Sequence, residues 1–403
     1  MTAGAGKILG VAGYVLLAFL AAAALGVLVA AIPILGELGP VLMSYAGPWI
    51  TLVSLIGAAM IFRRWRAKGQ PFLLAMTILA AFAGVATAFA QARQIAVARK
   101  NGAKIDLVQA LLAHSQTDTT LVPLTAIYAR HNGEPLPLDI YRPEAAAAGA
   151  DAPVLVYIHG GGWNAQTLKQ RQADYRWFAE RGYLVISLEY TLASEKRHTW
   201  DVVQPQLGCA LAWVGANAGR YGGDASRLAL WGESAGGNLV LNLSYMANQG
   251  SLKLSCPGEV PKVDATIALY PVVDPARMFR NPDVLIGGFG RLMTVNYTGG
   301  SPDQFPDRYA VIASSMHISA AAPPTLLIVP EADHLVVPAA AAEFAGRARA
   351  AGIDMQMIRM PYAEQAFDLR SGSIGNQMVR EVMLRFLNQK GLRADNRAIV
   401  QNQ

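Results

Sequence analysis

The sequence predicts an α/β fold, in which a mostly parallel sheet is flanked by helices, preceded by a three-helix transmembrane region. Of the 403 residues, 53% are hydrophobic and only 15% are charged, which indicates a membrane part joined to a globular one. Nearly uncharged runs cover residues 8–35, 41–62 and 72–90, and each approaches the ~20 residues that an α-helix needs to cross a bilayer. Beyond residue 120, continuous apolar segments alternate with amphipathic ones, the pattern of a parallel sheet buried on both faces.

The first apolar run has a second interpretation. Lys7 followed by an alanine-rich stretch resembles a signal peptide, but the run is long and two more follow it. We therefore expect residues 1–92 to form a retained membrane region with three transmembrane helices.

The short basic segment "RRWRAK" between the second and third runs indicates the side of the membrane. Because cytoplasmic loops are rich in Lys and Arg, this segment predicts a cytoplasmic N-terminus. The C-terminal domain would then be periplasmic or extracellular, anchored to a bacterial-type inner membrane by a multi-pass region. The basic residues after the third run argue for the opposite orientation: Arg93, Arg99, Lys100 and Lys104.

The formal charge of +6 lies in the membrane flanks. Nine of the 34 basic residues and one of the 28 acidic residues, Glu37, fall within the first 104 positions, so the remainder holds 25 basic and 27 acidic residues. A basic excess confined to membrane flanks excludes nucleic acid as an expected partner.

After the membrane region we expect a juxtamembrane helix at 93–119, an α/β domain at 120–392 and a tail at 393–403. Apolar and basic residues recur at helical spacing in 93–119, as in a helix near a lipid surface; a helix that caps the domain is the alternative. In the domain, Asn132-Gly133 predicts a hairpin, and a small cap insertion is expected at about 275–320.

The expected strands and helices alternate along the domain. The strands are "VLVYIHGG", "YLVISLEY", "LALWG", "ATIALYP", "TLLIVP" and "DMQMIRMP". The helices cover residues 169–181, 203–220, a stretch after Ser234, residues 337–351 and a closing segment that ends near Gln389.

Cysteine and histidine usage gives no sign of a metal site. The two cysteines, Cys209 and Cys256, are expected to be buried free thiols, although an outward-facing domain would permit a disulfide. No metal-binding spacing of cysteine and histidine occurs in the sequence.

Two glycine-rich segments indicate chemistry. Gly232-Glu233-Ser234-Ala235-Gly236 lies between an expected strand and an expected helix, the context in which Gly-x-Ser-x-Gly forms a nucleophile elbow. Upstream, His159-Gly160-Gly161-Gly162-Trp163 follows another strand, where glycines let backbone N–H groups point at a developing oxyanion. A glycine-rich turn with no further role is the alternative for the second segment.

The segments "HGGGW", "YTLA", "RYGGDASRLALWGESAGG" and "APPTLLIVPEADHLVVP" resemble the α/β-hydrolase superfamily, particularly the carboxylesterases of the hormone-sensitive-lipase-like group. The resemblance covers the chain from about 120 to 392 and implies the α/β-hydrolase fold. It implies Ser234 as nucleophile and the N–H groups of Gly161, Gly162 and Ala235 as oxyanion hole. It implies Asp333 as the acid that orients a histidine base; a helix N-cap is the alternative for Asp333.

The histidine base that this resemblance implies is absent. "PYAEQAFD" aligns with the family's histidine segment so that Gln365 occupies the histidine position, and an amide cannot accept the serine proton near neutral pH. His334 is the first alternative base, but its side chain should point away from that of Asp333. His159 belongs to the oxyanion turn, His198 and His317 are expected in loops or on the surface, and His114 and His131 precede the core of the domain.

The cap insertion holds the candidate substrate pocket. Phe279, Phe289 and Met293, together with Trp163, are expected to line an apolar acyl pocket, and packing of the cap onto the domain is an equally good reason for these side chains. We expect a membrane-anchored serine carboxylesterase that acts on a small apolar ester without cofactor or metal, impaired by Gln365. A ligand-binding pseudoenzyme and an acyltransferase are the alternatives, and the sequence does not reveal the oligomeric state.

Overall fold

The computed structural model describes residues 3–117, 122–143 and 151–394, with side chains from residue 11 onward. The expected boundary between residues 119 and 120 and the expected tail beyond residue 394 lie outside the described residues. The chain divides into two compact units. The first contains residues 1–114, 330–334 and 360–381, and the second contains residues 115–329, 335–359 and 382–403.

Four helices begin the first unit: α1 (Ala3–Leu28), α2 (Leu35–Lys68), α3 (Pro71–Lys100) and α4 (Leu107–Leu111). By length and composition, α1, α2 and α3 are able to cross a membrane. Small residues let these helices approach closely: Ala24, Ala80 and Ala83 are fully buried, and a Cβ atom on Gly84 would lie 2.5 Å from the Leu55 side chain. The second and third expected spans fall within α2 and α3, whereas α1 ends before the 8–35 run does, ahead of Pro33.

The expected separate helix at 93–119 is wrong. Residues 93–100 belong to α3, which continues without a break to Lys100 because Ala, Gln and Arg dominate there and favour helix. Asn101 and Gly102 end the helix. The five-residue α4 then starts at Leu107, where the Asp106 carboxylate accepts hydrogen bonds from the N–H groups of Val108 and Gln109.

The second unit is built on an eight-stranded sheet with the order β1-β2-β4-β3-β5-β6-β7-β8. β1 and β2, and β2 and β4, pair antiparallel, and β4, β3, β5, β6 and β7 are joined by parallel pairs. The strands are β1 (Leu124–His131), β2 (Glu134–Tyr141), β3 (Ala152–Ile158), β4 (Leu184–Leu188), β5 (Gly223–Glu233), β6 (Ala265–Leu269), β7 (Thr325–Pro330) and β8 (Met355–Met360). The expected hairpin is confirmed: Asn132 and Gly133 join β1 to β2 with φ of 50° and 84°.

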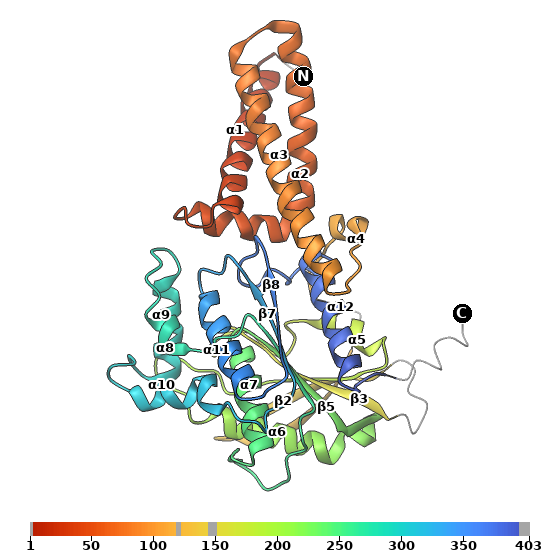
Figure 1. Cartoon of the computed structure of the whole chain (residues 1–403), viewed down its shortest axis with the longest axis vertical. Helices are drawn as coiled ribbons and strands as arrows, with labels where there is room; N and C mark the ends of the chain where they lie inside the picture. The colour runs from red at the N-terminus through yellow and green to blue at the C-terminus, as the bar shows by residue number, and fades with distance from the viewer. Residues whose placement is uncertain (1–2, 118–121, 144–150, 395–403) are drawn as a thin grey trace, which may run out of the picture. The chain divides into compact units, whose positions relative to one another are not determined.

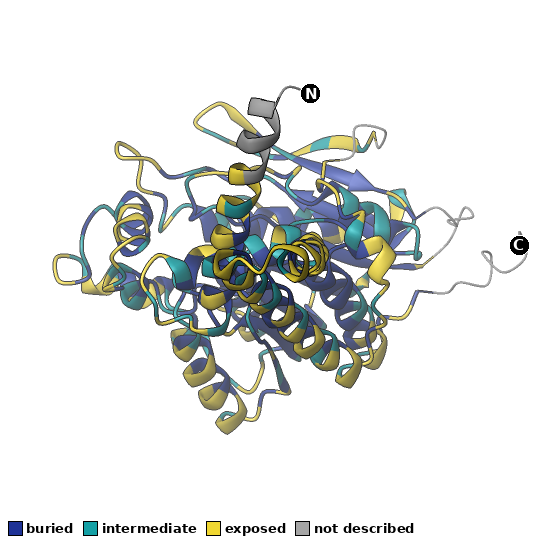
Figure 2. Cartoon of the chain, turned by 90° about the horizontal axis from the view of Figure 1, so that it is seen from above, coloured by how far each residue is buried: buried dark blue, intermediate teal, exposed yellow. Residues whose placement is uncertain are grey.

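Helices cover both faces of this sheet. Figure 1 shows α6 (Val203–Asn217), α7 (Ala235–Gln249) and α11 (Pro338–Ala350) on one face, and α5 (Gln172–Ala179) and α12 (Ile374–Gln389) on the other. All residues of β3, β4 and β6 are buried, and Figure 2 shows the sheet in the dark blue of buried residues. The expected helices are confirmed, although α5 is shorter than 169–181.

Three helices and a 3₁₀ turn fill the insertion between β6 and β7. They are α8 (Pro275–Phe279), α9 (Gly287–Thr298), α10 (Pro306–Ile312) and η2 (Ser314–His317). They occupy the segment in which the cap was expected.

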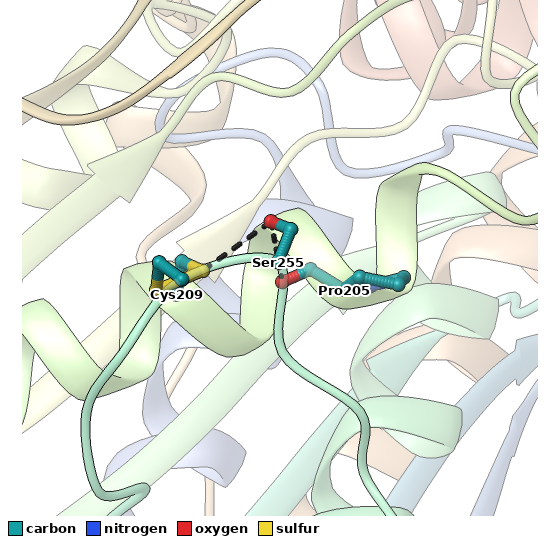
Figure 3. Close-up of a disulfide and its surroundings, with 4 residues drawn as sticks. Pro205, Cys209 and Ser255 are labelled. Carbon is teal, nitrogen blue, oxygen red and sulfur yellow. Dashed lines mark hydrogen bonds between the residues drawn. A yellow bond between two sulfur atoms is a disulfide. The ribbon is translucent and has the colours of Figure 1, made fainter.

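The expectation of two free thiols is wrong. Cys209 and Cys256 form a disulfide, with Cα atoms 5.8 Å apart (Figure 3). Cys209 lies on α6 and Cys256 in the loop between α7 and β6. The loop folds back on α6, where the Ser255 hydroxyl donates to the Pro205 carbonyl. No sequence pattern predicts the path of such a loop, so the pairing was not foreseen.

Candidate active site

Ser234 lies at the turn between β5 and α7 and has the strained backbone of a nucleophile elbow. Its φ is 53° and its ψ is −118°, a region that a non-glycine residue adopts only when its surroundings enforce it. The turn requires small neighbours: a Cβ atom on Gly232 would lie 2.4 Å from the Gly236 carbonyl oxygen, and one on Gly236 would lie 2.2 Å from the Ile158 carbonyl oxygen. The Ser234 N–H donates to the Leu269 carbonyl of β6 at 2.9 Å, which fixes the turn to the sheet.

The glycine-rich turn after β3 lies directly beside the elbow. A Cβ atom on Gly160 would lie 3.3 Å from the Ser234 Cβ and 2.8 Å from the Glu233 carbonyl oxygen. Gly161 and Gly162 have φ of 88° and 60°, values that glycine adopts freely. The structure therefore places Gly160 against the elbow, and the two glycines expected to form the oxyanion hole follow it in the same turn. Ala235 is the first residue of α7, where a helix leaves its N–H groups without an intrahelical partner.

His159 is fully buried and fixes the shape of this turn. Its Nε2 lies 2.8 Å from the Glu189 carboxylate, its Nδ1 lies 3.0 Å from the Gly160 carbonyl oxygen, and its ring stacks on Tyr190 with centroids 4.3 Å apart. Both ring nitrogens are thus occupied, and His159 has the structural place that the sequence analysis gave it.

A buried ionic network holds Glu233, the residue next to Ser234. The Glu233 carboxylate accepts hydrogen bonds from Arg171 Nε at 2.5 Å, Tyr270 at 2.9 Å and Tyr157 at 3.0 Å. Arg171, which is itself fully buried, also pairs with Asp174 at 2.9 Å. Only the elbow motif pointed to Glu233 in the sequence, and no local pattern links it to Arg171, 62 residues earlier.

Asp333 and Gln365 belong to the first unit, on two loops that lie side by side. The Ala332 N–H donates to the Ala363 carbonyl at 2.9 Å, and the Glu331 N–H donates to the Met360 carbonyl at 2.9 Å. Asp333 is buried at 5% exposure. It is not the N-cap of α11, because that helix begins after Val337 and has no side-chain cap. The N-cap alternative is therefore wrong.

Glu364, which precedes the expected histidine position, is the acceptor that joins these two loops. Its Oε1 accepts the N–H groups of Gln365 at 2.9 Å and of His334 at 2.8 Å. Its Oε2 lies 2.5 Å from His334 Nδ1. The sequence analysis missed this pair because the two residues are 30 positions apart.

His334 is unsuited to replace the missing base. Its Nε2 lies 3.0 Å from the Ala30 carbonyl oxygen while its Nδ1 faces Glu364, so both nitrogens face acceptors and both carry protons. The hydrogen bond to Glu364 is the largest cause that raises the pKa of His334, to about 9. A histidine that is protonated near neutral pH has no lone pair with which to accept the serine proton.

Two other histidines have ring nitrogens that face backbone carbonyls, and two more lie in or next to strands or bridges. His198 Nδ1 lies 2.8 Å from the Asn296 carbonyl oxygen, and His317 Nε2 lies 2.8 Å from the Val311 carbonyl oxygen. His131 is in the β1–β2 hairpin and His114 bridges to Ser371.

The four expected pocket residues differ in their surroundings. Met293 of α9 is buried beside the oxyanion turn, and its Sδ would lie 2.3 Å from a Cβ atom on Gly162. Trp163 is fully buried and stacks on Tyr297 with ring centroids 4.5 Å apart. Phe279 packs edge-on against Tyr309, whereas Phe289 is 51% exposed. Met293 thus lies against the glycine turn that Trp163 continues.

A mostly parallel sheet with flanking helices and a serine on a strained strand-to-helix turn defines an α/β-hydrolase. The BD-FAE family model matches residues 138–347, more than half of the 403 residues. The chain belongs to the BD-FAE family.

Several curated relatives are named as esterases or ester hydrolases. Esterase LipQ of Mycobacterium tuberculosis is 27% identical over 62% of this chain and 58% of its own length. Ethyl acetate hydrolase of Pseudomonas putida is 29% identical over 60% of this chain and 74% of its own length. The chain spans about half the length of the first curated relatives it matches.

Solved structures agree on the fold. Esterase 2 of Thermogutta terrifontis with bound propionate has a TM-score of 0.57 at 22% identity and covers 69% of this chain and 98% of its own. At this identity the likeness shows the fold alone.

Proposed function

We propose that the protein is a serine carboxylesterase-type hydrolase that acts on a small apolar carboxylic ester. The observation that carries the proposal is the Ser234 elbow, held at φ 53° beside the glycine turn at Gly160–Gly162. This arrangement suits attack on a carbonyl and stabilisation of the resulting oxyanion. The esterase names of the curated relatives support the same reaction class.

The proposed reaction has two steps, neither of which needs a metal or cofactor. Ser234 Oγ attacks the ester carbonyl while the backbone N–H groups of Gly161, Gly162 and Ala235 stabilise the oxyanion. The serine proton passes through a base to the alcohol, which leaves, and an acyl-serine remains. Water then attacks this ester and releases the acid. Asp333 is proposed as the acid that orients the base.

In this chain the base is the missing part, so the proposed activity is low. General-base help contributes typically ~100- to 10,000-fold to a rate. Gln365 has an amide in place of an imidazole, and His334 is held protonated by Glu364. What remains is the catalysis that oxyanion stabilisation and binding provide without a base.

The test compares the chain with Gln365→His for hydrolysis of short and medium p-nitrophenyl esters, with Ser234→Ala as the blank. The histidine variant should gain ~100-fold or more, while the original stays near the blank. If the original already turns over well and the histidine adds little, Gln365 does not interrupt the mechanism and a different base must act.

We further propose that α1, α2 and α3 anchor the protein in a membrane, with the hydrolase domain on the periplasmic or outer side. Their length and composition support spanning. The Cys209–Cys256 disulfide supports an oxidising compartment. A reporter fused to the C-terminus tests the orientation: activity from a reporter that works only in the cytoplasm would overturn the outward placement.

A second candidate is a ligand-binding pseudoenzyme, which the occupied state of both His334 nitrogens favours. It predicts a saturable ligand with no turnover even after histidine is restored at position 365. An acyltransferase would use the same residues as the hydrolase. Product analysis with an added alcohol distinguishes it, because the transferase forms a new ester where the hydrolase forms only the acid.

A further inference from the structure

The two loops that carry Asp333 and position 365 pack with the N-terminal helices. Residues 330–334 and 360–381 cluster with α1 to α4 in the first compact unit. Both loops follow strands, β7 and β8, that belong largely to the sheet of the second unit. Loops that carry residues of a functional site are held in position by the residues that they contact.

Three hydrogen bonds, each accepted by a backbone carbonyl, join these loops to the helical region. Gln94 on α3, buried at 6% exposure, donates to the Pro361 carbonyl at 3.1 Å. His334 donates to the Ala30 carbonyl, in the turn between α1 and α2, at 3.0 Å. Arg370 donates to the Tyr45 carbonyl of α2 at 2.7 Å.

An apolar contact supports the same connection. Tyr362 packs against a cluster formed by Val27, Met43 and Ala90, one from each long helix. Its ring also meets Phe89 nearly edge-on, with centroids 6.1 Å apart. Tyr362 has φ of 56° and Ala366 has φ of 63°. Two strained residues flanking position 365 indicate that the surroundings determine the loop's shape.

We propose that the N-terminal helices, beyond anchoring the protein, position the two loops that carry Asp333 and residue 365. Gln94 and His334 then act as positioning residues, and a shift among α1, α2 and α3 alters the alignment of these loops. The inference rests on the proposed esterase function and adds a regulatory connection to the same site.

Gln91 and Gln94 give a matched pair for the test. Both are buried glutamines on α3, one turn apart, and both donate amide hydrogen bonds. Gln94 donates to the loop, whereas Gln91 donates to Thr51 of α2 at 2.7 Å, inside the helical bundle. Substituting each with Leu removes a hydrogen bond of the same kind, but only one of these bonds reaches a loop of the candidate site.

The experiment uses the full chain in detergent micelles with Gln365→His as the parent. Gln94→Leu should lower kcat ~10- to 100-fold, the loss expected when a reacting group is slightly misplaced, with KM nearly unchanged. Hydrogen exchange of residues 360–372 should accelerate in the same variant. Gln91→Leu should leave kcat and this exchange close to the parent. Arg370→Met, at a more exposed position, should have the same effects on kcat and exchange. It takes the place of Gln94→Leu if Gln94→Leu folds poorly.

The outcomes separate this inference from the proposed function. If Gln94→Leu and Arg370→Met match Gln91→Leu in both kcat and loop exchange, the positioning role is overturned. If exchange rises in these variants but the parent hydrolyses no ester, the connection between helices and loops stands and the esterase function fails.

Discussion

Glu233 and Arg171 show how a single residue pair supports the elbow. Arg171 is fully buried, and it is held by the carboxylates of Glu233 and Asp174. A buried charge that loses its partner is costly because water cannot reach it. The backbone of Glu233 leads directly into Ser234, so the network restrains the strained turn.

Replacing Arg171 with Met should destabilise the protein by about 3–5 kcal/mol, because Glu233 is then buried without its cation. Arg176→Met, in helix α5 that follows Arg171, is the control: the Arg176 and Glu180 side chains are 42% and 39% exposed, and exposed pairs contribute at most about 1 kcal/mol. Denaturant unfolding of both variants measures the difference. Equal stability losses would show that the Arg171 network does not carry the predicted energy.

The His334–Glu364 pair gives the first unit a pH dependence. The pKa of His334 is raised from 6.5 to about 9, so the folded protein holds this proton more tightly than the unfolded chain. The stabilisation is therefore complete below pH 6.5 and is lost as pH rises through 9. The carboxylates that face His334 are Glu364 and, from α2, Glu37.

The melting temperature of the chain should thus exceed that of His334→Asn by the largest margin near pH 6. The margin should shrink steadily towards pH 10. Thermal melts of both proteins across this range measure it, and a margin that stays constant or grows with pH would contradict the ion pair.

At the residue scale, the sequence predicted the strained turn at Ser234 and the glycine turn after β3, because each is a local motif. It did not predict the partners of His334 and Glu233. Those partners lie 30 and 62 positions away, and their contacts depend on how loops and helices pack in three dimensions.

At the scale of elements, the elbow depends on the absence of side chains. Gly232 and Gly236 permit a close approach between β5, α7 and the end of β3, because a Cβ atom on Gly232 or Gly236 would lie only 2.4 Å or 2.2 Å from a backbone carbonyl oxygen. The sequence predicted most strands and helices because apolar periodicity is local. The sequence-based prediction ended the third membrane helix too early, at residue 92. Basic residues occur at membrane boundaries, but they also continue a helix, so Arg93 and Arg99 do not mark its end.

Gly236→Ala should distort the elbow, since its Cβ would collide with the Ile158 carbonyl oxygen. Labelling of Ser234 by a fluorophosphonate should fall at least ~10-fold, as for a misplaced reacting group. Gly346→Ala in α11 is the control: nothing lies within 4 Å of its Cβ position, and alanine stabilises a helix interior by about 0.5–1 kcal/mol. Undiminished labelling of Gly236→Ala would contradict this account of the turn.

At the scale of the whole molecule, the disulfide closes a loop of 47 residues between α6 and β6. A crosslink of this span stabilises a protein by about 4 kcal/mol in the chain-entropy model. It also supports the proposed outward placement of the domain, because thiols in the cytoplasm stay reduced. The sequence supplied both cysteines but not the loop path that brings them together.

Alkylation of intact cells should leave Cys209 and Cys256 unmodified until a reductant is added. The Cys209→Ser, Cys256→Ser double variant should melt below the unreduced chain and no longer respond to the reductant. Rapid alkylation of both cysteines without reductant would contradict the disulfide and remove its support for an outward domain.

The central claim is that Ser234 is a nucleophile and that its base is missing because position 365 holds glutamine instead of histidine. Single-turnover acylation of Ser234 by p-nitrophenyl butyrate, followed by the mass of the Ser234 peptide, tests it most directly. The account predicts acylation of Ser234 alone, ~100- to 10,000-fold faster in Gln365→His than in the original chain, with a rate that rises as the new histidine loses its proton. Equal acylation rates in the two proteins, or an acyl group on another residue, would contradict it.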